Sequence, residues 1–243
     1  MKAVLTLIVL TGMVTTLFAA EPSQPKSRTE QSLEGWTIRI DDRLTADAPD
    51  AALGQRALKF LEAKLVEIKS VVPAGKVALL QRVPIILDLE CGKLRSMQYH
   101  PSAGWLKDNG FPEELAKCVH LPRAADVATR RNINEQPWVI LHELAHAFHD
   151  QHLSFEHPEI KAAQEAYKAS GRGDATLLYN GKKVKHYALT NQMEFFAEMT
   201  EAYFGMNDFY PFNRAELQDA EPEIFQLLHS IWSDEKPPET TSP

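Results

Sequence analysis

Apolar and polar positions in the first part of the chain follow first the period of a strand and then that of a helix. The segment 35–43 (GWTIRIDDR) alternates apolar and polar residues, which predicts an opening β-strand. Between 47 and 72 the apolar residues recur at helical spacing and predict a long packed helix. The very apolar run 83–89 (VPIILDL) predicts a short buried strand.

The pattern becomes irregular between 90 and 136 and then strongly helical. In the irregular part we expect only a short helix at 112–117 and a short strand at 118–121. The later elements that we predict are a helix capped by Asn134 with Pro137 in its first turn, a helix from Pro158 to Lys168, a hairpin with a type I′ turn at Asn180-Gly181, a helix capped by Thr190 or Asn191, and a helix from Asn213 to Trp232. This order predicts an α+β domain, mostly helical, with a small mixed sheet ahead of the helix that follows Pro137.

The N-terminus has the pattern of an export signal. Met1 and Lys2 precede a mostly apolar run that ends at Ala20, which is typical of a secretory signal peptide. A retained anchor helix is the alternative, but the run is barely long enough to span a membrane. The predicted organisation is a signal peptide at 1–20, a flexible leader at 21–34, a single domain at 35–232 and a disordered tail at 233–243. We therefore expect an exported protein, periplasmic or secreted, with no stable membrane insertion after signal cleavage.

Composition excludes some functions and leaves others open. A net charge of −7 without any long basic cluster argues against nucleic-acid binding, and 44% hydrophobic residues allow a sizeable core. The two cysteines, Cys91 and Cys118, could pair in an exported compartment, and two unrelated buried thiols are an equal alternative. Neither cysteine has the spacing of a zinc ligand, and nothing in the sequence indicates an oligomeric state.

The helical stretch 138–152 (WVILHELAHAFHDQH) carries the strongest chemical signal. It places His142, Glu143 and His146 in the spacing H-E-x-x-H. Residues four apart lie on one face of a helix, so the two imidazoles can share one metal ion. Zinc suits such ligands, and a neighbouring carboxylate can act as the general base, which makes Glu143 the candidate. The alternative is an ordinary amphipathic helix whose histidines are merely solvated.

Two solutions compete for the third ligand. His152 occupies the position of the third histidine in the metzincin pattern H-E-x-x-H-x-x-G-x-x-H, but His149 stands where that pattern needs glycine for a sharp turn. On a regular helix His149 is too far along the axis to bind the same ion, so we expect it beside the site. The other solution is a carboxylate of the later helix, Glu194 or Glu198, which lie one turn apart. The second glutamate of such a pair can hydrogen-bond the free ring N–H of a ligand histidine.

The segments HELAHAFHD and HYALTNQMEFFAEMTEAYF together resemble the catalytic domain of the anthrax lethal factor group of zinc metallopeptidases and its secreted bacterial relatives. In that group the H-E-x-x-H helix is followed by a helix bearing E-F-F-A-E, whose first glutamate completes the zinc site. The resemblance implies a zincin-like domain with one zinc ion per chain, bound by His142, His146 and Glu194. It also implies Glu143 as the general base.

The same resemblance assigns two further residues. It implies that Glu198 supports a zinc ligand from behind and that Tyr187, seven residues before Glu194, stabilises the oxyanion. The likeness extends loosely over 83–212 and is not visible in the first helix, so substrate preference does not carry over.

The expected function is an exported zinc-dependent metalloendopeptidase that acts on a peptide or protein substrate. Two alternatives stay open: a zinc-containing binding or assembly protein that hydrolyses nothing, and a metzincin-type peptidase that uses His152 as third ligand. The strand at 118–121 is our candidate for an edge strand that binds an extended substrate, or it only completes the sheet. His100 and His120 are expected to be surface or core histidines and not ligands.

Overall fold

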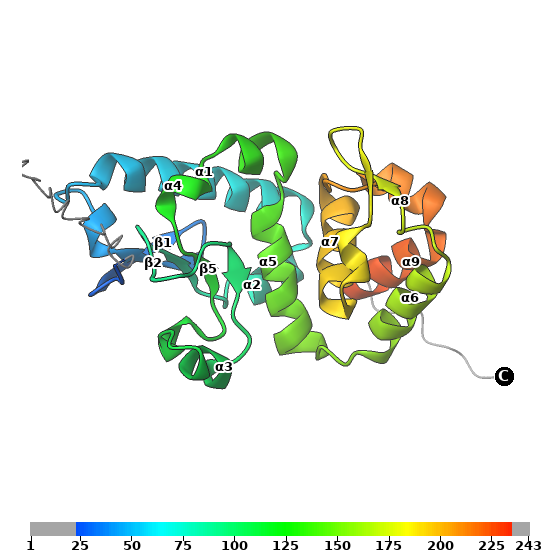
Figure 1. The fold of residues 1–243 in the computed structure, drawn as a ribbon, viewed down its shortest axis with the longest axis horizontal. Coiled ribbons are helices and arrows are strands. Elements are labelled where there is room, and N and C mark those ends of the chain that lie inside the picture. Colours follow the sequence, from blue (N-terminus) through cyan, green and yellow to red (C-terminus); the bar gives the residue numbers. More distant parts are fainter. Residues whose placement is uncertain (1–22, 235–243) are drawn as a thin grey trace, which may run out of the picture.

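Helix α5 (Val139–Phe148) stands between a β-sheet on one side and a group of helices on the other (Figure 1). The structure is a computed structural model that describes residues 23–234. The predicted signal peptide at 1–20 and residues 235–243 of the predicted tail lie outside this range. The described part is mixed α/β, about half helical with a small mixed sheet, as the sequence predicts. No helix within it is both long and apolar enough to cross a membrane.

The sheet has five short strands, of which the three central ones are paired in parallel. Their order across the sheet is β1 (Arg28–Leu33), β2 (Trp36–Asp41), β3 (Ile85–Leu87), β5 (Val119–Leu121) and β4 (Gln98–Tyr99). β2, β3 and β5 run parallel, while β1 and β4 lie antiparallel at the two edges. The predicted strands at 35–43, 83–89 and 118–121 are thus confirmed, although each is shorter than predicted.

Strand β1 corrects the prediction of a flexible leader, which is wrong for residues 28–33. β1 pairs with β2 along its whole length through a two-residue turn at Glu34-Gly35, where both residues have positive φ values of 53° and 94°. Positive φ at both turn positions is the geometry of a type I′ hairpin. The strand was missed because its sequence, RTEQSL, is mostly exposed and polar and has no apolar alternation.

The prediction of β5 as an edge strand is also wrong. β5 lies between β3 and β4, and the two-residue strand β4 occupies the edge next to α5. A two-residue strand has no measurable period, so the sequence pattern contained no signal for it.

The two faces of the sheet are covered differently. On one face the apolar side of α1 (Ala51–Val71), the long predicted helix, joins the main core, followed by α2 (Ala74–Leu80). On the other face Ile86 belongs to a small separate core beneath α3 (Ala103–Asp108) and the 3-10 turn η2 (Glu113–Leu115). This small core also contains Cys91 and Cys118, which are both buried and unpaired, so the alternative of two free thiols holds.

The chain enters α5 differently from the predicted capped start. After the short α4 (Ala124–Val127) it forms one π-helical turn, η3 (Arg131–Glu135), and α5 begins only after Trp138. Asn134 lies inside η3, so its predicted role as N-cap is wrong. At its other end α5 continues into a second π-helical turn, η4 (His149–Leu153).

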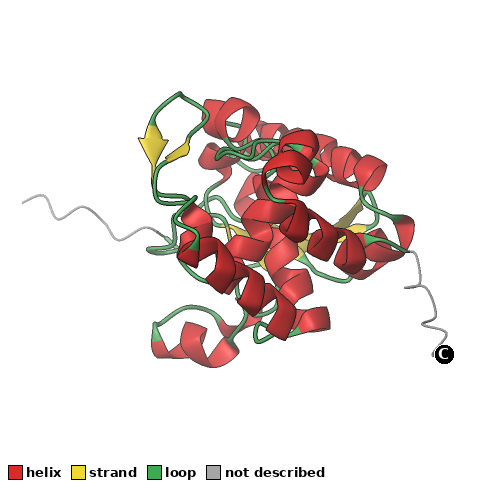
Figure 2. Cartoon of the chain, turned by 90° about the vertical axis from the view of Figure 1, so that its right-hand side faces the viewer, coloured by secondary structure: helices red, strands yellow, loops and turns green. Residues whose placement is uncertain are grey.

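The helical half follows η4 and is seen face on in Figure 2. α6 (Pro158–Ala169) matches its prediction, and a small hairpin of β6 (Thr176–Leu177) and β7 (Lys183–Val184) follows. The predicted type I′ turn is wrong, because only Gly181 of the turn pair has a positive φ, of 84°. The predicted C-terminal helix is two helices, α8 (Arg214–Ala220) and α9 (Pro222–Trp232). Glu221 between them has non-helical backbone angles, and Pro222 starts the second helix because it has no N–H to continue the first.

Helix α7 (Gln192–Phe204) packs along α5 and completes the framework of the cleft described next. Asn191 caps it, as predicted, by accepting hydrogen bonds from the N–H groups of Met193 and Glu194, each at 2.9 Å. At the far end of α7, a Cβ placed on Gly205 would lie 2.0 Å from Cε2 of Trp138. Only glycine therefore lets the end of α7 approach the beginning of α5 so closely.

Candidate metal centre

The three predicted ligands meet between α5 and α7. The imidazoles of His142 and His146 lie one turn apart on α5, with ring centroids separated by 4.7 Å. The Oε2 atom of Glu194, in the first turn of α7, lies 3.2 Å from Nε2 of each histidine. One donor atom from each residue lies within 4.8 Å of the other two. Two helices thus bring two imidazole nitrogens and one carboxylate oxygen together in a group that could hold a metal ion.

The burial pattern of α5 explains why these side chains point at α7. Almost every residue of α5 is buried, including Leu141 and Leu144 in the main core. A helix surrounded by protein must satisfy its polar groups internally. The histidines therefore face the acidic side of α7.

A carboxylate behind the ligands orients His142. Nδ1 of His142 lies 2.7 Å from Oε1 of Glu201, whereas the nearest oxygen of Glu198 is 3.8 Å from the same nitrogen. Glu201, and not the residue implied by the resemblance, thus makes the hydrogen bond, and Glu198 lies further back, 3.8 Å from His186. The signal for Glu201 is its place two turns after Glu194, on the same stripe of α7.

The charges of the ligand group depend strongly on one another. Burial alone would raise the pKa of Glu194, but hydrogen bonds with His142 and His146 outweigh burial and lower that pKa far below its usual range. Burial likewise opposes charge on His142, yet hydrogen bonds with Glu194 and Glu201 raise its pKa. A positive charge is therefore favoured between these groups.

This arrangement fits a bound cation. When Nδ1 of His142 donates its proton to Glu201, the lone pair of Nε2 points at the carboxylate of Glu194. Two acceptors facing each other at 3.2 Å need either a proton or a metal ion between them. Among the described residues, the nearby buried atoms Oε2 of Glu198 and Oε2 of Glu201 have no hydrogen-bond partner. The cluster as a whole is thus rich in negative charge, as a metal site requires.

Glu143 lies next to the ligands in a fixed orientation. Its side chain is buried, and its Oε2 accepts a hydrogen bond of 2.8 Å from the backbone N–H of Tyr99 in β4. Burial raises the pKa of this carboxyl group. The hydroxyl of Tyr99 is 2.5 Å from Oδ2 of Asp150, so a hydrogen bond links the edge strand β4 to the turn η4 that follows α5. No sequence pattern predicts this contribution of Tyr99.

The ligands open into a cleft of about 780 Å³. Tyr99 and Glu143 line it from the sheet side, and Tyr187 and Glu194 line it from the helical side. Tyr187 lies in the 3-10 turn η5 (Tyr187–Leu189), and 47% of its surface is exposed. Burial and the negative charge of Glu194 raise the pKa of its hydroxyl, so this group remains a hydrogen-bond donor at neutral pH.

His149 and His152, which follow the H-E-x-x-H motif, lie outside the group of His142, His146 and Glu194. His149 has helical backbone angles, φ −59° and ψ −46°, so the sharp turn of a metzincin is absent. Its ring is fully buried against Phe155 and Phe196, as expected for a residue beside the site, and burial lowers its pKa to about 4. The ring of His152 packs against Phe148 and belongs to no cluster of metal-ligand atoms among residues 23–234.

Comparisons with known proteins add nothing to this geometry. No protein-family model matches the chain, and neither curated proteins nor solved structures give a match.

Proposed function

We propose that this protein is an exported zinc-dependent metalloendopeptidase with a zincin-like domain, similar to the catalytic domain of the lethal factor group. The observation that carries the proposal is the convergence of His142, His146 and Glu194 inside a cleft that also holds Glu143, with Oε2 of Glu194 3.2 Å from Nε2 of each histidine. Three protein ligands with space for water define a catalytic zinc site, whereas a structural site is closed. Export rests on the sequence pattern of residues 1–20.

Each residue then has a separate task. When bound, zinc supplies Lewis acidity, which polarises the scissile carbonyl and lowers the pKa of water to about 7. Glu143 takes the proton from the attacking water and passes it to the leaving amine. Tyr187 donates a hydrogen bond to the oxygen on which negative charge develops. Glu201 keeps the Nε2 lone pair of His142 directed at the ligand position.

The substrate in this proposal is an extended peptide that lies along the edge of the sheet. β4 is the edge strand, it packs beside α5, and the residues from Ser96 to Tyr99 line the cleft. An exposed strand edge offers backbone groups to an added strand. β5 pairs with one side of β4 and Glu143 uses the N–H of Tyr99, so the groups left for the substrate are the other backbone groups on the cleft side of the segment from Ser96 to Tyr99.

The substitution Glu143→Gln tests the proposal most directly. It keeps the shape of the side chain but removes the proton acceptor, so we expect cleavage of a peptide library to fall about 10²–10⁴-fold. Zinc content, measured by mass spectrometry of the purified protein, should stay at the wild-type level. Cleavage at the wild-type rate by this variant would exclude Glu143 as the base. Wild-type protein that holds zinc but cleaves no peptide would instead support the non-catalytic alternative.

Tyr187→Phe tests the oxyanion role. Loss of one oxyanion donor costs about 10²–10³-fold in kcat, and KM should change little because the ground state does not use this bond. Tyr179→Phe is the matched control, since Tyr179 is similarly exposed on the β6–β7 hairpin but does not line the cleft. Equal kcat values for the two variants would remove Tyr187 from the mechanism.

A further inference from the structure

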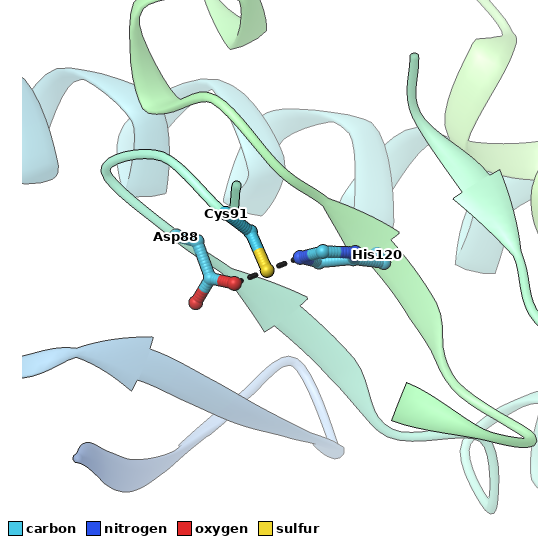
Figure 3. Close-up of side chains that lie close together, drawn as sticks. All are labelled: Asp88, Cys91 and His120. Atoms are coloured by element: carbon cyan, nitrogen blue, oxygen red, sulfur yellow. Dashed lines mark hydrogen bonds and ion pairs between the residues drawn. The ribbon is translucent and has the colours of Figure 1, made fainter. Parts of the chain in front are cut away.

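A second group of metal-ligating side chains lies away from the cleft, in the small core beneath α3. Figure 3 shows its members, Asp88, Cys91 and His120, with their side chains directed toward one another. Asp88 and Cys91 follow β3, and His120 is the central residue of β5. One ligand atom from each lies within 4.8 Å of the other two, and all three residues are fully buried.

Partners outside this group already orient its ligand atoms. His120 presents Nε2 to Oδ2 of Asp88 at 2.8 Å, while its Nδ1 lies 3.2 Å from Nε2 of the buried His100. Oδ1 of Asp88 accepts a hydrogen bond of 2.7 Å from Arg28, which also bonds Oδ2 at 2.8 Å. Oδ2 of Asp88 is thus shared by Arg28 and His120, whereas Nδ1 of His120 and Oδ1 of Asp88 are the outer atoms. Hydrogen bonds to such outer atoms fix ring tautomers and carboxylate orientation.

The local charges can accommodate a cation. Arg28 forms ion pairs with the buried Asp88 and with Glu114, whose side chain is 63% exposed. A divalent ion bound to the thiolate of Cys91 would balance these charges. Buried charges are tolerated where they are compensated in this way.

We propose that Asp88, Cys91 and His120 bind a structural zinc ion, independently of the function proposed for the cleft. The donor set of one sulfur, one nitrogen and one oxygen suits zinc and excludes magnesium and calcium, which prefer oxygen alone. Tetrahedral coordination places donors about 3.3–3.8 Å apart, so Asp88 and His120 need to separate by less than ~1 Å. The fourth position falls to a water molecule, as in a catalytic site, but all three ligands are fully buried, so a substrate does not reach the ion. The ion therefore binds as the chain folds and performs no catalysis.

Cobalt substitution distinguishes this site from the cleft. Co²⁺ replaces zinc in such sites, and a cobalt–thiolate bond gives a charge-transfer absorption that nitrogen and oxygen ligands do not give. The cleft ligands include no sulfur, so this absorption reports the second site alone. For the full chain with thiols kept reduced, we expect the absorption band and two metal ions per chain.

Cys91→Ser should lose the band and one of the two ions. Cys118→Ser is the matched control, because Cys118 is the other buried thiol of the same small core and lies outside the ligand group. It should keep both the ions and the band. If Cys91→Ser does not fold, the double variant His142→Ala/His146→Ala provides the second measurement, since emptying the cleft should leave the band intact.

One metal ion per chain and no thiolate band in the wild-type protein would overturn this proposal and leave the cleft proposal standing. Loss of the band in Cys118→Ser alone would also overturn it. If the band is present but the cleft binds no metal, the proposed function fails and the second site remains.

Discussion

The cleft cluster (His142, His146, Glu194) and the sealed cluster (Asp88, Cys91, His120) are built from similar residue types in opposite surroundings. The cleft cluster joins two helices and opens to solvent, and the side chain of Glu194 keeps 19% of its surface exposed. The sealed cluster joins two neighbouring strands, and none of its residues is exposed. A substrate can reach only the first.

The two clusters therefore differ in whether solvent and a substrate can reach them. An open position for water and substrate makes catalysis possible, whereas a closed donor set can only stabilise the fold. The comparison predicts that damage to the cleft cluster removes activity with little loss of stability. Damage to the sealed cluster should have the opposite effect.

Removal of the carboxylate ligand from the cleft should give the largest effect. Glu194→Ala leaves two histidines, which is too few for tight zinc binding, so we expect loss of one zinc ion per chain and of all peptide cleavage. The thermal unfolding midpoint in the presence of a chelator should match that of the wild-type protein. His152→Ala is the control and should keep both zinc and activity; the reverse result would restore the metzincin assignment.

Removal of the ion pair beside the sealed cluster should give the next largest effect. In protein freed of metal by a chelator, Arg28→Ala leaves the buried carboxylate of Asp88 without its cation, and breaking such a pair costs about 3–5 kcal/mol of unfolding free energy. Urea denaturation measures this cost. Arg39→Ala is the control in the same sheet, because its ion pair with Glu30 is exposed and is worth less than about 1 kcal/mol.

The acid dependence of stability gives a second measurement for Arg28. Burial would raise the pKa of Asp88, but hydrogen bonds from Arg28 and His120 outweigh burial and lower that pKa. A carboxyl group with a depressed folded-state pKa stabilises the fold above its unfolded pKa of about 3.9, and this contribution is lost as pH falls further. Wild-type protein should therefore lose stability below about pH 4 more steeply than Arg28→Ala. Equal slopes would mean that the pair does not control Asp88.

The smallest effect should come from the carboxylates behind the cleft ligands. Glu201→Ala removes the partner of His142, and changes of this kind lower metal affinity about 10–100-fold. Glu198→Ala is closely matched, since both glutamates are buried on the same helix, and it should leave zinc affinity near the wild-type value. Competition with a chromophoric chelator measures both. A larger loss in Glu198→Ala would return the supporting role to the residue that the resemblance implied.

The sequence predicted the cleft better than it predicted the sheet, for a physical reason. On a helix, the spacing of residues decides which side chains share a face. The segments H-E-x-x-H and M-E-F-F-A-E therefore predicted the faces of five side chains, and only the contacts between the two helices depended on tertiary structure. Glu201 was missed as a partner because its spacing from Glu194 alone does not decide which carboxylate reaches His142. That choice depends on how α7 is rotated against α5.

Periodic patterns in the sequence could not predict the two edge strands of the sheet, β1 and β4. β1 is polar and exposed, and it is held by one turn with positive φ values and by the ion pair of Arg28 with Asp88. β4 has two residues, and its place is set by contacts of Tyr99 with Glu143 and Asp150. Interactions between residues far apart in sequence decide both strands, so local propensity could not reveal them.

The contact between Gly205 and Trp138 lets α5 and α7 approach each other closely beside the cleft cluster. Trp138 precedes His142 by one turn of α5, and Gly205 follows Glu201, the partner of His142, by one turn of α7. Any side chain at position 205 would meet the indole ring, so one of the two helices would have to shift. A residue without a side chain thus helps to set how closely the carboxylates of α7 approach His142.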